Sequence, residues 1–357
     1  MARRTTHRTN WSLTPEIEDA VRRGEVDTLA LQLKGTPKLV LARTDQRETL
    51  LHLAAEAGHL DVVRLLLAAN AEVDAVTPSE EFLVEFTGLV AIGGTTPLLV
   101  ALRNRHVEVA TELLEAGANP HVIDANGRSI FHTAIAQGFL AIAEKLLGLG
   151  VSVNELGADK ESALVTAIYA KDRLALSWLL ECGANPNIQS RQGTVPLVAA
   201  ISANDPVMAE RLIDHGADIE LADNYGRTPL GAAAGSGREA MTRLLLGRGA
   251  QPNRADRHGN TALHSATANP ITVALLLEAG ANPNSAGYGG RTPVHEAAYL
   301  GTPETLRLLL DAGGDLCALT HDGKTPLDYA RRFNRDKNVN WIVSACEAFT
   351  KLRGSPL

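Results

Sequence analysis

The histidines and cysteines are the residues of this chain that could do chemistry. His295-Glu296 begins like the His-Glu-x-x-His pattern with which metalloproteases bind zinc. Tyr299 occupies the position that the second histidine ligand requires, so this zinc site is incomplete. The chain has three cysteines, Cys182, Cys317 and Cys346. They are widely spaced, so none of them forms a Cys-x-x-Cys pair. We therefore expect no metal site.

Two glycine-containing segments begin to look like nucleotide-binding loops without completing the pattern. Gly323-Lys324-Thr325 looks like the end of a phosphate-binding loop, but Ala318 stands where the first glycine of that loop should be. Gly235-Ser236-Gly237 has the pattern of a turn between two helices. No Gly-x-Ser-x-Gly motif is present, and Cys182, with no His or Asp in register, is expected to be a packed thiol. We expect neither an enzyme nor a bound cofactor.

Composition narrows the classes of function. With 357 residues, the chain is long enough for several domains or for one extended array. Its formal net charge of −7 argues against non-specific nucleic-acid binding, which needs an excess of Lys and Arg. The odd number and wide spacing of the cysteines indicate a reducing compartment, so we expect a cytoplasmic protein. No run of about 18 apolar residues occurs, so no membrane-spanning segment is expected.

A 33-residue period organises the chain. A Thr or Ser, or its positional equivalent, precedes an expected helix at Thr49, Thr96, Ser129, Ser162, Val195, Thr228, Thr261, Thr292 and Thr325. Glycines recur in the same register at Gly117, Gly150, Gly183, Gly216, Gly249, Gly280 and Gly313. Successive members of both series are 33 residues apart, with two exceptions. The first gap of the Thr/Ser series is 47 residues, and each series has one gap of 31 residues. Two residue types that share one period indicate tandem structural units.

Each unit is predicted to contain two short helices and a loop. In Thr228-Pro229-Leu230, the threonine is a good N-cap, and the proline suits the first helical position because its missing N–H would be unpaired there anyway. Gly237, nine residues after Thr228, marks the turn between the helices. The second helix ends at the periodic glycine, which readily adopts the left-handed conformation of a helix C-cap. Asn70 takes that place in the first full unit.

These motifs resemble those of the ankyrin-repeat family. Thr49-Leu50-Leu51-His52-Leu53-Ala54-Ala55 and Asp223-Asn224-Tyr225-Gly226-Arg227-Thr228-Pro229-Leu230 are near-complete matches to the family pattern. The resemblance implies an all-α ankyrin-repeat solenoid of about ten units, in which stacked helix-turn-helix pairs carry outward β-hairpin loops. It also implies that a histidine stiffens the turn in four units, through bonds with neighbouring loop groups and the preceding hydroxyl: Thr49 with His52, Ser129 with His132, Thr261 with His264, and Thr292 with His295.

The resemblance divides the chain into an array with two tails. We expect a basic N-terminal tail over residues 1–12, the ankyrin array over residues 13–350 and a C-terminal tail over residues 351–357. Residues 13–43 are expected to form an N-terminal capping repeat, and residues 320–350 a C-terminal one. In the latter, four side chains share a helical spacing and are expected to pack onto the preceding unit: Trp341, Ile342, Ala345 and Phe349.

Two breaks interrupt the period. The first gap is 14 residues too long, which places an insertion with apolar residues within residues 77–94. Either this insertion folds back over its neighbours or it meets a partner. The 31-residue unit lacks two residues near Ala268-Asn269-Pro270, which is expected to tighten the turn between its helices.

The contact positions usual in the family, carried across in register, define a candidate concave binding surface. Its C-terminal half comprises Arg191, Gln192, Asn224, Tyr225, Arg227, Arg257, His258, Tyr288, Arg291, Tyr299, His321, Lys324, Arg332 and Phe333. Its N-terminal half comprises Gln46, Glu48, Glu56, Arg103, Asn104, Asn126, Arg128, Gln137, Asp159, Glu161 and Tyr169.

The C-terminal half of this surface is basic and aromatic, although the chain as a whole is acidic. Its candidate residues include no carboxylate, and Tyr and Arg are the residue types enriched at binding hot spots. We hypothesise that this half grips an acidic or phosphorylated peptide or loop of a partner protein. Alternatively, the scattered charges only keep a long surface soluble.

The sequence thus predicts a non-catalytic protein–protein interaction scaffold or adaptor that acts as a monomer. A fold resemblance does not identify the partner. Rival interpretations are a regulatory inhibitor that masks the active site of a partner enzyme, a host-directed effector, and an enzyme with an unorthodox site.

Overall fold

The structure, a computed structural model, describes residues 13–77, 94–124 and 127–353. These residues form helices joined by turns, and no named strand occurs among them. Three loops carry isolated β-bridges, of which Arg43 with Thr49 is the first. The predicted all-α class is therefore confirmed, with single bridges where the resemblance implied hairpins.

The chain divides into two units, residues 1–175 (unit 1) and 176–357 (unit 2). Unit 1 contains α1 (Pro15–Arg22), α2 (Val26–Gly35), η1 (Pro37–Leu41), α3 (Leu50–Ala57), α4 (Leu60–Ala68), α5 (Pro97–Arg103), α6 (Val107–Glu115), α7 (Ile130–Gln137), α8 (Leu140–Gly148), η2 (Ala158–Lys160) and α9 (Ala163–Tyr169). Helix α10 (Arg173–Glu181) contains the boundary. Unit 2 continues with α11 (Pro196–Ala203), α12 (Pro206–Asp214), α13 (Pro229–Gly235), α14 (Glu239–Gly247), α15 (Ala262–Ala266), α16 (Pro270–Glu278), η3 (Tyr288–Gly290), α17 (Pro293–Leu300), α18 (Pro303–Asp311), α19 (Pro326–Arg332) and α20 (Asp336–Arg353).

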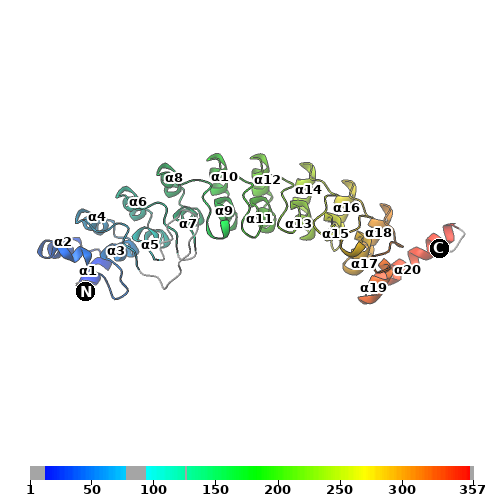
Figure 1. Ribbon diagram of the computed structural model, residues 1–357, viewed down its shortest axis with the longest axis horizontal. Coiled ribbons are helices and arrows are strands. Elements are labelled where there is room, and N and C mark those ends of the chain that lie inside the picture. The colour runs from blue at the N-terminus through cyan, green and yellow to red at the C-terminus, as the bar shows by residue number, and fades with distance from the viewer. Residues whose placement is uncertain (1–12, 78–93, 125–126, 354–357) are drawn as a thin grey trace, which may run out of the picture. The chain divides into compact units, whose positions relative to one another are not determined.

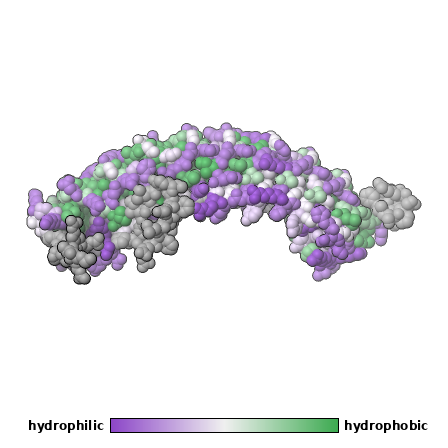
Figure 2. Space-filling model, in the orientation of Figure 1, coloured by the Kyte–Doolittle hydropathy of each residue, from purple (hydrophilic) through white to green (hydrophobic). Residues whose placement is uncertain are grey.

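The helices of each unit form two layers (Figure 1). In unit 1 the first helices of successive pairs, α3, α5, α7 and α9, lie side by side, and the second helices α4, α6 and α8 form the neighbouring row. In unit 2 the rows are α11, α13, α15, α17 and α19, and α12, α14, α16 and α18. Hydrophilic residues cover much of the visible face of each unit, with hydrophobic residues between them (Figure 2).

Local chemistry sets the start and end of the helices. The Thr228 hydroxyl accepts a hydrogen bond from the Gly231 N–H at 3.1 Å, which satisfies an otherwise unpaired group at the helix start. At the end of each second helix, the periodic glycine adopts a positive φ, as at Gly249 with φ 90°, and Asn70 does so at 60°. A Cβ added at Gly249 would meet no atom within 4 Å, so the backbone conformation alone selects glycine there.

Small side chains allow the first helices to pack on several sides. In α13, Leu230 and three successive alanines, Ala232–Ala234, are all buried. The second helix α14 buries one stripe, with Met241 and Leu245 in it. Helix α13 is therefore buried on more sides than α14, since its small residues allow neighbouring helices to approach closely.

The 31-residue unit differs from the prediction. Helix α15 has five residues, whereas α13 has seven and α17 has eight. The turn that follows α15 has the same three-residue length as the turn after α13, so the missing residues shorten the helix and do not tighten the turn. Asn269 closes that turn by accepting hydrogen bonds from the N–H groups of Ile271 and Thr272.

The C-terminal helix α20 packs against α18 and α19. Ile342 is fully buried, while Trp341 and Ala345 are half-buried. The side chain of Phe349 lies outside the described part of the structure, so its predicted packing stays a prediction.

Two further sequence expectations have different outcomes. Cys182 is exposed, so the prediction of a packed thiol is wrong: its position next to the C-cap glycine of α10 leaves it at the surface. Of the insertion predicted within residues 77–94, residues 78–93 lie outside the described residues, and both interpretations of it stay open. Its flanks meet where the Thr77 N–H donates to the Thr95 carbonyl at 3.1 Å.

Candidate binding surface

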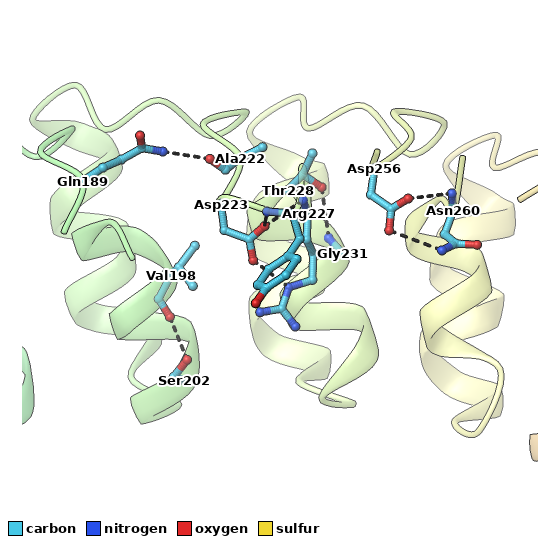
Figure 3. A network of polar contacts seen from close by, with 11 residues as sticks. Gln189, Val198, Ser202, Ala222, Asp223, Arg227, Thr228, Gly231, Asp256 and Asn260 are labelled. Atoms are coloured by element: carbon cyan, nitrogen blue, oxygen red, sulfur yellow. Dashed lines mark hydrogen bonds and ion pairs between the residues drawn. The ribbon is translucent and has the colours of Figure 1, made fainter. Parts of the chain in front are cut away.

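Two loop tips of unit 2 are built around a capping carboxylate, and that of Asp223 is the first of them. Asp223 Oδ1 accepts hydrogen bonds from the N–H groups of Tyr225 and Arg227, both at 2.9 Å. The Gly226 N–H donates to the Asp223 carbonyl, and the Asp223 N–H donates to the Arg227 carbonyl. Tyr225 lies at the tip of this closed turn and is 69% exposed. Figure 3 shows the contacts of Asp223 with Arg227.

The same cap recurs in other units and was missed in the sequence. Asp256 accepts from the N–H of His258 and from that of Asn260, and Figure 3 shows the contact with Asn260. Asp124 accepts from the N–H of Arg128. Hydroxyl groups replace the carboxylate in three units: Thr44, Ser190 and Thr320. The sequence contains a signal for this cap, because each of these residues stands five positions before the N-cap residue of its repeat.

Neighbouring tips in unit 2 are bonded to one another. The Arg257 N–H donates to the Tyr225 carbonyl at 3.2 Å, and the His321 N–H donates to the Gly289 carbonyl at 2.9 Å. Between them, the Tyr288 N–H donates to Asn260 Oδ1 at 3.1 Å. These bonds join tips of successive repeats, so their exposed side chains project from an ordered base.

Four histidines, two in each unit, form hydrogen bonds at the bases of the loops. His52 Nε2 donates to the Thr95 carbonyl at 2.8 Å, so Nδ1 is the acceptor for the Thr49 hydroxyl, also at 2.8 Å. The corresponding hydroxyl-to-Nδ1 distances are 2.9–3.0 Å for Ser129 with His132, Thr261 with His264 and Thr292 with His295. The Nε2 atoms of these three histidines form hydrogen bonds with the carbonyls of Glu161, Arg291 and Lys324, respectively.

Burial keeps these histidines neutral. Desolvation lowers the pKa of His52, His264 and His295, and it lowers the pKa of His132 to about 4. Both ring nitrogens of each histidine already have protein partners. Among the residues that the structure describes, no group of three or more His, Cys, Asp and Glu side chains could hold a metal ion.

Two candidate arginines have carboxylate partners that the sequence-based set omitted. Arg227 Nε lies 3.2 Å from Asp223 Oδ2, and Arg291 Nη1 lies 3.2 Å from Glu296 Oε1. Burial raises the pKa of Glu296, while Arg291 acts to lower it. The sequence-based set contains no carboxylate because it leaves out these two acids. Each lies four or five residues from its arginine in the sequence, and the fold brings the pair together.

Three other cations of the set differ from these two arginines. Within the described residues, no ion pair involves Arg257, Lys324 or Arg332, and all three are exposed. Arg191 and Asn224 are also exposed, and Asn224 Nδ2 donates to the Arg191 carbonyl at 3.3 Å.

Aromatic rings lie beside these cations. Tyr288 is 61% exposed, makes an edge-to-face contact with His258 at 5.7 Å between centroids, and has the Arg291 guanidinium 5.6 Å from its ring centre. Further along, the rings of Tyr299 and Phe333 lie 4.1 Å apart. Exposed rings with adjacent guanidinium groups are typical of protein-binding hot spots.

The candidate residues of unit 1 are more strongly paired. Glu56 pairs with Arg22, Arg103 pairs with Asp124, and Gln137 accepts from Arg105. A cleft of about 270 Å³ lies between α7, η2 and α9, with Tyr169 exposed at its edge and Arg128 and Glu161 in its lining. Asn126 and the insertion lie outside the described residues.

Comparisons with known proteins agree with this geometry. The family model described as "Ankyrin repeats (3 copies)" matches residues 17–124, 81–156, 112–190, 164–256, 197–287 and 272–351. The chain belongs to the ankyrin-repeat family. The predicted family and fold class are thus confirmed, and ankyrin repeats are domains that generally mediate protein–protein interaction.

Relatives of this ankyrin-repeat protein include two curated proteins. The NF-kappa-B inhibitor delta of Mus musculus is 32% identical over 102 residues, which are 29% of this chain and 28% of that protein. The probable E3 ubiquitin-protein ligase XBOS31 of Oryza sativa subsp. japonica is 30% identical over 121 residues, which are 33% of this chain and 24% of that protein. The match thus spans about a quarter of each relative.

Solved structures of ankyrin domains are also similar. The human ASB11 ankyrin repeat domain has 27% identity and a TM-score of 0.53, and the match covers 60% of this chain and 97% of that chain. The ankyrin repeat domain of Bcl-3, a member of the IkappaB protein family, has 26% identity and a TM-score of 0.54, with coverages of 61% and 99%. In the described part of this ankyrin-repeat protein, no helix combines the length and the apolarity needed to cross a membrane.

Proposed function

We propose that this ankyrin-repeat protein is a non-catalytic scaffold or adaptor that binds a partner protein through the loop tips and first helices of unit 2. The observation that carries the proposal is the bonded series of tips, in which Tyr225 and Tyr288 are exposed while their own backbone groups are fixed. A surface that is ordered before binding loses less conformational entropy when a partner docks.

The proposed partner contacts this surface with an acidic or phosphorylated segment. Arg257, Lys324 and Arg332 support this chemistry because they are exposed and make no ion pair among the described residues. Arg227 and Arg291 contribute less net charge than the sequence suggested, since Asp223 and Glu296 compensate them. The competing interpretation is that these cations only keep the surface soluble, and it predicts no dependence of partner affinity on their charge.

A second candidate function is inhibition of a partner by covering its active or binding site. The similarity to NF-kappa-B inhibitor delta over 102 residues favours it. We further infer that the chain works in the cytoplasm as a monomer, in line with its widely spaced cysteines.

Affinity capture followed by a hydrogen-exchange footprint tests the scaffold proposal. The captured partner, purified and added back in excess, is expected to slow amide exchange at the tips around Tyr225, His258 and Tyr288. Amides in the second helices α12, α14 and α16 serve as the internal control and are expected to be unchanged. Protection confined to those second helices, or no protection in unit 2, would contradict the proposal. Inhibition is separated from scaffolding by whether the partner retains its own activity in the complex.

A further inference from the structure

The turn between α19 and α20 is held in one conformation. Asn334 has a φ of 53°, in the left-handed region, and the Arg335 N–H donates to the Ala330 carbonyl at 2.9 Å. One turn later, the buried Asn338 side chain donates to the carbonyls of Ala298 and Gly301, each at 3.1 Å. The start of α20 is therefore fixed to the end of α17, where Tyr299 lies.

Arg332, at the end of α19, and Arg335, in the turn, lie beside two aromatic rings that contact each other. The ring of Tyr299 lies 4.1 Å from that of Phe333, with 36° between the ring planes. The Arg335 guanidinium carbon is 5.7 Å from the centre of the Tyr299 ring, and the Arg332 carbon is 5.6 Å from the centre of the Phe333 ring. Phe333 remains 39% exposed. We call Tyr299, Arg332, Phe333 and Arg335 the cap cluster.

The arginines of the cap cluster differ from the paired arginines of unit 2. Some exposed arginines elsewhere in unit 2 do pair with carboxylates, as Arg248 does with Glu210 and Asp214. Among the described residues, neither Arg332 nor Arg335 makes an ion pair. The nearby Asp328 is engaged by the N–H and hydroxyl of Thr325.

A guanidinium that lies against a ring keeps its in-plane N–H donors available. Arg presents five such donors in a rigid fork that matches the oxygens of a phosphoryl group. Two guanidinium groups carry two positive charges, and a phosphate monoester carries nearly two negative charges at neutral pH. A single carboxylate would leave one of the positive charges uncompensated.

We propose that the cap cluster binds a phosphoryl group carried by the partner segment. This proposal rests on the proposed function and names the anion-binding part of the same surface. Arg332 and Arg335 donate to the phosphoryl oxygens, and the exposed part of the Phe333 ring packs against the apolar part of the modified side chain.

A titration of the full chain with inorganic phosphate tests the proposal. The readout is the arginine Nε–Hε nuclear magnetic resonance signals, with ionic strength held constant by sodium chloride. The signals of Arg332 and Arg335 are expected to shift and saturate, while that of Arg307, paired with Asp311, stays in place. Acetate, which carries one charge, is expected to bind about tenfold more weakly. No shift, equal shifts of all exposed arginines, or equal affinity for acetate would each overturn the phosphoryl assignment.

Two double variants complete the test. Arg332→Gln with Arg335→Gln is expected to weaken phosphate binding about tenfold or more, with an unchanged unfolding temperature. Arg248→Gln with Arg307→Gln removes two paired arginines that lie outside the candidate surface and is expected to leave phosphate binding unchanged. If phosphate binding fails while a partner still protects the tips of unit 2 from exchange, this inference falls and the proposed function stands. If the footprint on those tips is absent, the proposed function falls.

Discussion

Asp223 Oδ2 lies 3.2 Å from Arg227 Nε, while the other oxygen of the same carboxylate accepts two backbone N–H groups of the tip. One side chain therefore closes the turn and orients an arginine beside the exposed Tyr225. The order of the tip and the charge of the surface are coupled through this carboxylate.

Replacement of Asp223 separates these two roles. Asp223→Ala removes the acceptor for both N–H groups and is expected to lower the free energy of unfolding by about 1–2 kcal/mol. Asp223→Asn keeps an acceptor oxygen and removes only a partly exposed ion pair. We therefore expect it to lower the free energy of unfolding by less than about 1 kcal/mol. Urea unfolding measures both. Equal losses for the two variants would contradict the proposed role of the hydrogen bonds.

The glycine of the same tip should be more sensitive than a C-cap glycine. Gly226 has a φ of 80°, and a Cβ there would lie 2.8 Å from the Arg257 backbone nitrogen. Gly249 has a φ of 90° with no atom near an added Cβ. Gly249→Ala is expected to cost about 1–2 kcal/mol from backbone strain alone, and Gly226→Ala more. Equilibrium unfolding of the two variants decides this, and a smaller cost at Gly226 would show that the tips are not closely packed.

Stability should fall as the solution becomes mildly acidic. Burial lowers the pKa of His132 to about 4 from an ordinary value of 6.5. Between these two values the unfolded chain binds the proton more readily, so the stabilisation is complete above pH 6.5 and is lost as the pH falls toward 4. The pKa shift of His132 corresponds to about 3 kcal/mol in the free energy of unfolding. The lowered pKa values of His52, His264 and His295 change the stability in the same direction.

Urea unfolding at pH 7.5, 6 and 5 measures this dependence, with ionic strength held constant. His132→Gln has no imidazole to protonate, so its stability should depend less steeply on pH than that of the parent chain. Stability that is constant, or that rises between pH 7.5 and 5, would rule out buried neutral histidines as its cause.

The attachment of α20 depends on Asn338, whose amide donates to carbonyls at the end of α17. Asn338→Ala leaves these carbonyls without that donor and is expected to cost about 1–3 kcal/mol. Amide exchange in α20 should accelerate more than exchange in α13. Ser344→Ala, in the same helix, removes only an exposed bond to the Asn340 carbonyl and is the matched control. Unchanged exchange in α20 after loss of Asn338 would argue against this anchor.

The sequence predicted the repeat register and the helix pairs well because each depends on local chemistry. Thr228 and Pro229 start a helix by themselves, and Gly249 or Asn70 ends one through its own backbone preference. The shortened α15 was harder to predict, since a two-residue deletion fits equally well in a turn or at a helix end until packing is known.

The candidate surface was less predictable than the fold. Asp223 and Glu296 were outside the family contact positions, and only the folded turns bring them to Arg227 and Arg291. Cys182 was predicted to be packed because no His or Asp lies in register with it, yet it lies at the exposed helix end. The role of the binding residues stays a prediction, because contact with a partner depends on the surface of a second molecule.

The dissociation constant of the captured partner tests the central claim most directly. Tyr225→Ala with Tyr288→Ala removes two exposed rings from bonded tips of unit 2, and Val207→Ala with Ile271→Ala removes two exposed apolar side chains from its second helices. We predict that the tip variant raises the dissociation constant at least about tenfold, while the second-helix variant stays within about twofold of the parent chain. An unchanged constant for the tip variant, or an equal loss for both, would contradict binding through the tips.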